Sequence, residues 1–309
     1  MERFNIAFSV GNVALTWNAI ILALSILVAV VVSQILVKKR GAYKDLALDA
    51  CIVGIPAGLL GGRLFSAISG KIAFASFFRL AEAGLNLPGA LLFAGIGIAV
   101  YARVKKLSLA EVFDLLAPGA FFGLAIGRWS DFFLCDGLGP VVGAGVPKFF
   151  PLATFTKAYF SDGHTVAYAV FFLDFLVCLA LGIAALLLQK KLAKGRSARA
   201  AIIVYLFAEF TLEWLRDGST RQIVFGDVRF NQLIWIALLL FFIGLSLALY
   251  RREAKPEAAE KAEEPEQPEE PEAPEEPEQP EEPEESEAPE EPEQPEQPEA
   301  EAAPEGGEA

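Results

Sequence analysis

The chain has 309 residues, and its charge divides sharply near Arg252. Residues 1–252 contain 24 Lys/Arg and 14 Asp/Glu, a net charge of +10, whereas residues 253–309 contain 25 Glu and two Lys, a net charge of −23. The mean hydropathy is +0.41 despite this acidic segment, so residues 1–252 are far more apolar than a water-soluble domain. This composition excludes a water-soluble enzyme.

The cysteine and histidine content excludes several metalloprotein classes. The single His and the three Cys (Cys51, Cys135 and Cys178) follow no metal-ligand spacing, which argues against a zinc finger, a haem protein or an iron–sulfur protein. Three scattered thiols also give no disulfide framework.

Seven apolar stretches are long enough to cross a bilayer, whose core of about 30 Å needs roughly 20 apolar helical residues. Lipid forces a backbone to satisfy its own hydrogen bonds, so each stretch is predicted to be a helix. They lie at 18–37, 47–68, 86–102, 109–127, 165–188, 199–215 and 232–250. The predicted fold class is an all-α integral membrane protein with seven transmembrane helices. We expect the first stretch to be retained and not cleaved as a signal peptide, because no basic segment precedes it.

Lys and Arg collect in the short loops that follow the first, third, fifth and seventh stretches. These loops hold 15 such residues, and the opposite side holds ten in longer segments. The positive-inside rule therefore places the N-terminus outside and the C-terminus in the cytoplasm of a bacterial inner-membrane protein.

Residues 253–309 are predicted to form a disordered cytoplasmic tail, separate from a membrane domain at 1–252. Repeated Pro-Glu units with almost no apolar residue bury too little surface to offset chain entropy. The tail is either an acidic arm for an unidentified basic partner or a solvated segment that the anionic inner leaflet repels.

Ionisable residues inside apolar stretches are costly and mark functional sites or polar contacts between helices. They are Arg63, Asp114, Arg128, Asp131, Asp136, Asp174, Glu209, Glu213 and Arg216. Arg128 is predicted to lie at the outer membrane face beside Asp131 and Asp136. It either binds a phosphate or carboxylate through two hydrogen bonds or pairs with Asp131 to fix a helix end.

Glu209 and Glu213 share one helix face, and Arg216 lies three residues beyond Glu213. Glu213 is expected to pair with Arg216. Glu209 is expected to pair with Arg128 or Arg63 across the bundle, or to carry a proton as an acid or base.

Two further features of the sequence are a group of glycines and the single histidine. Gly58, Gly61 and Gly62 form a small-residue face that permits close helix packing. His164, the single His, is either catalytic or a hydrogen-bonded residue at the membrane boundary.

The order of these residues resembles that in the bacterial prolipoprotein diacylglyceryl transferase family over most of residues 10–252. The motifs that carry the resemblance are Gly61-Gly62-Arg63-Leu64, Lys105-Lys106-Leu107-Ser108-Leu109, Asp114-Leu-Leu-Ala-Pro-Gly119, Gly127-Arg128-Trp129, Phe132-Phe133, Gly139, Tyr168, Glu213-Trp-Leu-Arg216-Asp217 and Val228-Arg229-Phe230-Asn231-Gln232. The central block around Arg128 is the most specific.

The resemblance implies transfer of a diacylglyceryl group from phosphatidylglycerol to the lipobox cysteine of a preprolipoprotein. The partners it implies are this lipid, the signal peptide and membrane lipids, with no cofactor, no metal and no nucleic acid. By the resemblance, Arg128 matches the family's essential arginine and would bind the phosphate, and Gly139 and Glu213 match family residues of the same site. We expect Arg63 and Arg216 to support the phosphate, and Asp131, Asp136 and Glu213 to orient the headgroup. Glu209 is expected to act as the base, so the candidate catalytic residues are Glu213, Glu209 and Asp136, and Asp131 and Gly139 belong to the headgroup site.

The sequence departs from the family pattern at several positions. The family's His-Gly-Gly motif falls on Pro88-Gly89-Ala90, its signature Asn on Asp131, and its arginine one turn before Glu213 on Glu209. Its aromatic hydroxyl after Trp17 is replaced by Asn18. The sequence therefore leaves open an inactive relative that binds a phospholipid or a lipoprotein signal. A small-molecule transporter is disfavoured, because the charges cluster near one membrane face.

Overall fold

A computed structural model describes residues 5–10, 13–78, 85–143, 145, 147–217, 223–225 and 228–263 of the chain. The chain divides into two units, Met1–Ala259 and Glu260–Ala309, and nearly all the described residues belong to the first. The part of the predicted acidic tail that follows Glu263 lies outside the described residues.

Long helices make up most of the described chain, and short elements connect them. The long helices are α2 (Trp17–Arg40), α3 (Leu46–Ile68), α4 (Leu87–Val104), α5 (Leu109–Gly127), α8 (Val170–Leu188), α9 (Arg196–Leu215) and α10 (Phe230–Glu263). The short elements are β1 (Ile6–Val10), β2 (Val13–Thr16), η1 (Phe74–Ser76), α6 (Ser130–Leu134), β3 (Ala153–Phe155), α7 (Tyr159–Asp162), β4 (Val166–Tyr168), β5 (Ile223–Phe225) and β6 (Val228–Arg229). The strands form three antiparallel pairs, β1–β2, β3–β4 and β5–β6.

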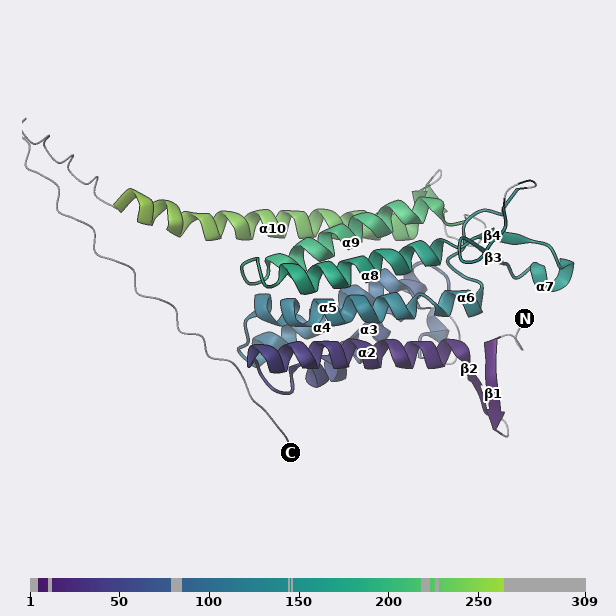
Figure 1. Ribbon diagram of the computed structural model, residues 1–309, viewed down its shortest axis with the longest axis horizontal. Coiled ribbons are helices and arrows are strands. Elements are labelled where there is room, and N and C mark those ends of the chain that lie inside the picture. Colours follow the sequence, from purple (N-terminus) through teal and green to yellow (C-terminus); the bar gives the residue numbers. More distant parts are fainter. Residues whose placement is uncertain are drawn as a thin grey trace, which may run out of the picture. The chain divides into compact units, whose positions relative to one another are not determined.

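The long helices lie side by side, and β1, β2, α6, β3, α7 and β4 gather at the end where α2 begins (Figure 1). Helix α3 packs on α4, α2 on α5, α5 on α8, and α8 on α9. One apolar core lies among α5, α8, α9 and α10 and includes Phe121, Cys178, Tyr205 and Trp235. This packing brings together residues that are far apart in the sequence.

Local sequence signals set several helix ends. The Thr16 side chain accepts a hydrogen bond from the Ala19 amide at the start of α2, and the Asn86 side chain accepts one from Gly89 at the start of α4. Such side-chain acceptors satisfy amides that have no partner within the first turn of a helix. Helix α2 ends at Gly41, whose φ of 61° is a conformation that favours glycine.

The small-residue face of α3 lies directly against α4, as expected from the sequence. A Cβ added to Gly61 would lie 2.5 Å from the carbonyl oxygen of Gly89, and one added to Gly89 would lie 2.7 Å from that of Gly61. Neither position can hold a side chain without moving a helix, so the two glycines allow the close approach.

Six helical segments of the described chain are long and apolar enough to cross a membrane. They are Trp17–Arg40, Leu46–Ile68, Leu87–Val104, Leu109–Leu134, Val170–Leu188 and Phe230–Arg251. Helix α2 exposes large apolar side chains such as Leu22, Leu27 and Ile35, which suit contact with lipid. The protein is therefore a mostly helical, multi-pass membrane protein.

Two of the predicted stretches differ in extent from the observed helices, and a third forms a helix that is not among the six segments. The stretch at 165–188 becomes helical only at Val170, because Val166–Tyr168 pair with β3. The stretch at 199–215 lies in α9, which is not among the six segments because it carries Arg196, Arg199, Glu209 and Glu213. Helix α10 continues past residue 250 to Glu263, into the predicted disordered tail, because Ala, Glu and Lys favour helix before the Pro-Glu repeats begin.

Candidate active site

Two arginines follow the last residues of packed helices at the same end of the bundle. Arg128 follows α5 and Arg216 follows α9. Both are buried, with 8% and 6% of their surface exposed. A buried guanidinium requires charged or polar partners, and these partners define the site.

Arg128 contacts three carboxylates that come from three helices. Its Nη2 donates to Glu209 of α9, and its Nη1 lies 3.7 Å from the Asp174 Oδ2 of α8 and 4.0 Å from the Asp131 Oδ2 of α6. The Tyr205 hydroxyl lies 3.4 Å from Nη2. Of the two partners expected for Glu209, the structure places Arg128 beside it.

Arg216 shares two of these carboxylates. Its Nη1 lies 2.9 Å from the Glu213 Oε2, its Nη2 donates to Asp174, and the Glu209 Oε2 lies 3.4 Å away. The expected pair between Glu213 and Arg216 is thus present.

These residues form one buried ion cluster, which consists of Arg128, Arg216, Asp174, Glu209 and Glu213, with Asp131 at its edge. Asp174, Glu209 and Glu213 are each no more than 1% exposed. The cluster sets four carboxylates against two guanidinium groups, so anions outnumber cations among its described members. The Nε atoms of both arginines are buried and have no hydrogen-bond partner in the described part of the chain.

Arg229 links the last helix to this cluster. Its guanidinium donates to the backbone carbonyl of Glu213, and its amide donates to the Gln232 side chain at 2.8 Å. Trp235 of α10 packs edge-on against Tyr205, with ring centroids 6.0 Å apart. The start of α10 is therefore tied to α9 beside Arg128.

A cavity of about 510 Å³ adjoins the buried ion cluster. Its wall is formed by Lys71, Leu85, Asn86, Leu87, Pro88, Arg128, Asp131, Cys135, Asp136, Gly137, Leu138, Gly139, Val141, Thr156, Lys157, Ala158, Thr165, Ala167, Arg216, Asp217, Asn231 and Trp235. Its size and its mixed polar and apolar wall suit a small polar group attached to an apolar chain.

The cavity separates the predicted site residues into two groups. Arg128, Asp131, Asp136, Gly139 and Arg216 line it. Glu209 and Glu213 do not belong to its wall, and they contact the arginines from within the bundle. The two glutamates therefore hold the arginines, whereas the arginines reach the cavity.

Arg63 lies apart from the cavity wall. Its Nη2 donates to the Ser76 carbonyl at 2.6 Å, and its Nε donates to the Phe77 carbonyl at 3.1 Å. These contacts tie the end of α3 to the turn that follows it, whereas the predicted role was to support phosphate binding.

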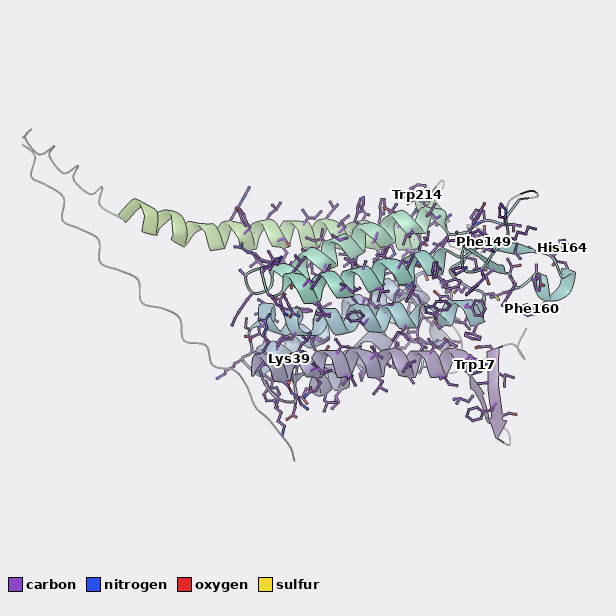
Figure 2. All side chains as sticks on the ribbon, viewed as in Figure 1. Trp17, Lys39, Phe149, Phe160, His164 and Trp214 are labelled. Carbon is purple, nitrogen blue, oxygen red and sulfur yellow. The ribbon has the colours of Figure 1, made fainter. Side chains whose placement is uncertain are left out.

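Two other candidate residues also lie elsewhere. His164 is exposed in the loop between α7 and β4, at the same end of the helices as Trp17 and Trp214 (Figure 2). Asp114 accepts hydrogen bonds from the Gly195 and Ala198 amides and from the Ser197 hydroxyl. It therefore caps the start of α9 from a neighbouring helix.

Five further residues line the cavity, although the sequence provides no reason to place them in a site: Lys71, Asn86, Lys157, Asn231 and Trp235. Asn86 and Asn231 are 145 residues apart, and the Asn86 Nδ2 donates to the Asn231 Oδ1 at 2.7 Å. No spacing pattern connects such residues. The sequence signals near them were the Asn231 motif of the resemblance and the Pro88-Gly89-Ala90 segment, which begins two residues after Asn86.

Cys135 also lines the cavity, directly after α6. Burial raises the pKa of this thiol, which favours its neutral form, and the charge of Lys157 opposes that effect. Among the described residues, no group of three His, Cys, Asp or Glu side chains is arranged to hold a metal ion.

The sequence matches the family model of prolipoprotein diacylglyceryl transferase over residues 5–250. The chain belongs to this family. The matched range contains the whole buried ion cluster and every residue of the cavity wall. The family expected from the motif order is confirmed.

Curated relatives agree with this assignment over almost their whole length. The chain is similar to the phosphatidylglycerol–prolipoprotein diacylglyceryl transferase of Clostridium kluyveri, with 27% identity over 252 residues, which cover 79% of this chain and 93% of the relative. The enzyme of the same name from Clostridium botulinum strain 657 is 30% identical over 249 residues, which cover 77% of this chain and 96% of the relative. That from the Langeland strain is 29% identical, with 77% and 95% covered.

Proposed function

We propose that this protein transfers the diacylglyceryl group of phosphatidylglycerol to the cysteine thiol of a prolipoprotein. Two observations support the proposal: the chain belongs to the transferase family, and the cavity presents two arginines to a phosphate. In this reaction the thiol sulfur forms a bond to the diacylglyceryl carbon, and the bond from that carbon to the phosphate oxygen breaks. Glycerol phosphate leaves, and the thiol proton passes to a base.

The residues in and beside the cavity have different roles in this reaction. Arg128 and Arg216 bind the phosphate and stabilise the charge that the leaving group gains. Asp131 and Gly139 orient the headgroup. Of the three carboxylates predicted to be catalytic, Asp136 lines the cavity, so we assign the thiol proton to it. Glu209 and Glu213 position the two arginines.

The proposed membrane arrangement has seven spans, in which α9 joins the six apolar segments and is the sixth span in chain order. Its charged residues support this placement, because Glu209 and Glu213 are paired inside the bundle and are not directed at lipid. The basic loops follow α2, α4, α8 and α10, whereas the cavity lies at the opposite ends of the helices. This asymmetry supports an outer-leaflet cavity, an outside N-terminus and a cytoplasmic C-terminus in a bacterial inner membrane. The division into a membrane domain at 1–252 and an acidic tail at 253–309 rests on composition.

The test is transfer by the full-length protein in membranes. Labelled diacylglyceryl should move from phosphatidylglycerol to a peptide that carries a lipobox cysteine, and no label should move to the matched peptide in which Ser replaces that cysteine. The gene should also sustain lipoprotein maturation when a host's own transferase is depleted. If neither occurs while the protein still binds the lipid, the protein is instead an inactive phospholipid-binding relative.

A further inference from the structure

Both arginines of the cavity are already engaged by carboxylates. Each Nη atom of Arg128 and of Arg216 lies within 4.0 Å of a carboxylate oxygen. A lipid phosphate that reaches them must replace a carboxylate or approach the Nε edges, and it meets an excess of negative charge in the buried ion cluster. Initial capture of an anionic headgroup therefore requires positive charge elsewhere in the cavity wall.

Two lysines supply that charge. Lys71 follows α3 and Lys157 precedes α7, and both line the cavity while remaining exposed. Within the described ranges of the chain, neither lysine forms an ion pair or a side-chain hydrogen bond. In that part of the chain no carboxylate oxygen therefore lies within 4.0 Å of either ammonium group, whereas one lies within that distance of each Nη atom of Arg128 and of Arg216.

Neighbouring backbone contacts hold both lysines at the cavity. The Lys71 amide donates to the Ser66 carbonyl at 2.9 Å, which anchors the residue to the end of α3. Beside Lys157, the Thr156 hydroxyl donates to the Thr165 carbonyl at 3.1 Å, and both threonines line the cavity. The two side chains are thus attached to fixed points of the wall.

The same cavity wall contains a buried donor that lacks a protein acceptor. Trp235 is 1% exposed, and its indole nitrogen has no hydrogen-bond partner among the described residues. Burying an N–H group without an acceptor costs free energy, so an oxygen atom of a ligand in the cavity could accept the hydrogen bond of this indole group.

We propose that Lys71 and Lys157 form a phosphate-capturing pair at the cavity, which selects anionic glycerophospholipids and delivers their phosphate to Arg128 and Arg216. The inference rests on the proposed function for the identity of the lipid. A lysine ammonium acts as a point charge without fixed geometry, so it suits capture and release, whereas the arginines suit a fixed phosphate geometry. The pair therefore governs binding of the lipid and not the chemical step.

Kinetics of the full-length protein in mixed micelles test this pair. Lys71→Gln and Lys157→Gln should each raise the KM for phosphatidylglycerol roughly fivefold to tenfold, the scale of one ordinary net hydrogen bond, with kcat nearly unchanged. The double variant should also lose most of the salt dependence of KM, because salt screens exposed charges. The matched control is Lys148→Gln, which removes an exposed lysine outside the cavity wall and should leave KM unchanged.

A binding measurement separates this inference from the proposed function. Wild-type protein should bind phosphatidylglycerol in nanodiscs more tightly than phosphatidylcholine, and the double variant should lose this preference even if no transfer occurs. Glycerol phosphate should compete with the lipid, and inorganic phosphate should compete more weakly if the pair recognises a glycerol phosphoester. A double variant with the KM and lipid preference of Lys148→Gln would overturn the inference.

Discussion

Buried carboxylates lie near both ends of α9, and the protein satisfies them in different ways. Near the start of the helix, Asp114 is held by the Gly195 and Ala198 amides and the Ser197 hydroxyl. Near its end, Glu209 and Glu213 are held by guanidinium groups that line a cavity. The first arrangement is a fixed helix cap that no ligand can replace. The second consists of ion pairs whose cations also face a substrate-sized space.

The largest effect is expected at the cavity end. Arg128→Ala should abolish transfer and lower the free energy of unfolding by about 3–5 kcal/mol, because it leaves Glu209 and Asp174 buried with one cation fewer. Transfer rates and thermal unfolding in detergent, followed by tryptophan fluorescence, measure both changes. Lys39→Ala is the control, since Lys39 is exposed at the opposite end of the helices (Figure 2).

A double variant separates the two roles of Arg128. Glu209→Gln added to Arg128→Ala removes the uncompensated charge, so it should restore part of the lost stability while transfer stays absent. Transfer at the wild-type rate in either variant would contradict the assignment of Arg128 to the phosphate.

An intermediate effect is expected at the start of α9. Asp114→Ala should lower the free energy of unfolding by about 2 kcal/mol, because two amides and a hydroxyl lose their buried acceptor. Transfer per folded molecule should stay unchanged, since Asp114 does not line the cavity. The matched control is Glu111→Ala on the same helix, whose exposed pair with Lys194 contributes less than about 0.5 kcal/mol. A loss of activity larger than the loss of folded protein would contradict a purely structural cap.

The smallest effect is expected at an exposed carboxylate outside the membrane. Hydrogen bonds from the Thr165 hydroxyl and from the His164 and Thr165 amides lower the pKa of Asp162 from its ordinary 3.8 to about 2. Because the folded pKa is the lower one, the contribution to loop order is complete above pH 3.8 and is lost as the pH falls toward 2. Hydrogen exchange of residues 163–165 should rise over that interval. In Asp162→Asn it should be raised already at neutral pH, without any change in transfer.

Much of the fold could be predicted from the sequence, because long apolar stretches have few alternatives to helix in lipid. The stretches at 18–37, 47–68 and 109–127 lie within observed helices, and the Gly61 face packs closely as expected. The start of α8 was misplaced, because Val166–Tyr168 are as apolar as the helix and only pairing with β3 distinguishes them. The charged residues of α9 were predicted from the sequence to mark a functional site or a polar contact between helices. The same charges keep α9 out of the six apolar segments.

The sequence by itself determined which residues carry charge inside an apolar body, that Lys and Arg collect after alternate apolar stretches, and which family the motif order resembles. Only the tertiary structure decided that Glu209 and Glu213 contact the arginines from inside the helix bundle, outside the cavity wall. It also decided that Arg63 lies outside that wall and that Lys71 and Lys157 both line it. The physical reason is that a helix in lipid is apolar on most faces, so its hydrophobic pattern does not show which face is turned toward the neighbouring helices. The partners of each charge therefore depend on how α5, α8, α9 and the loops pack.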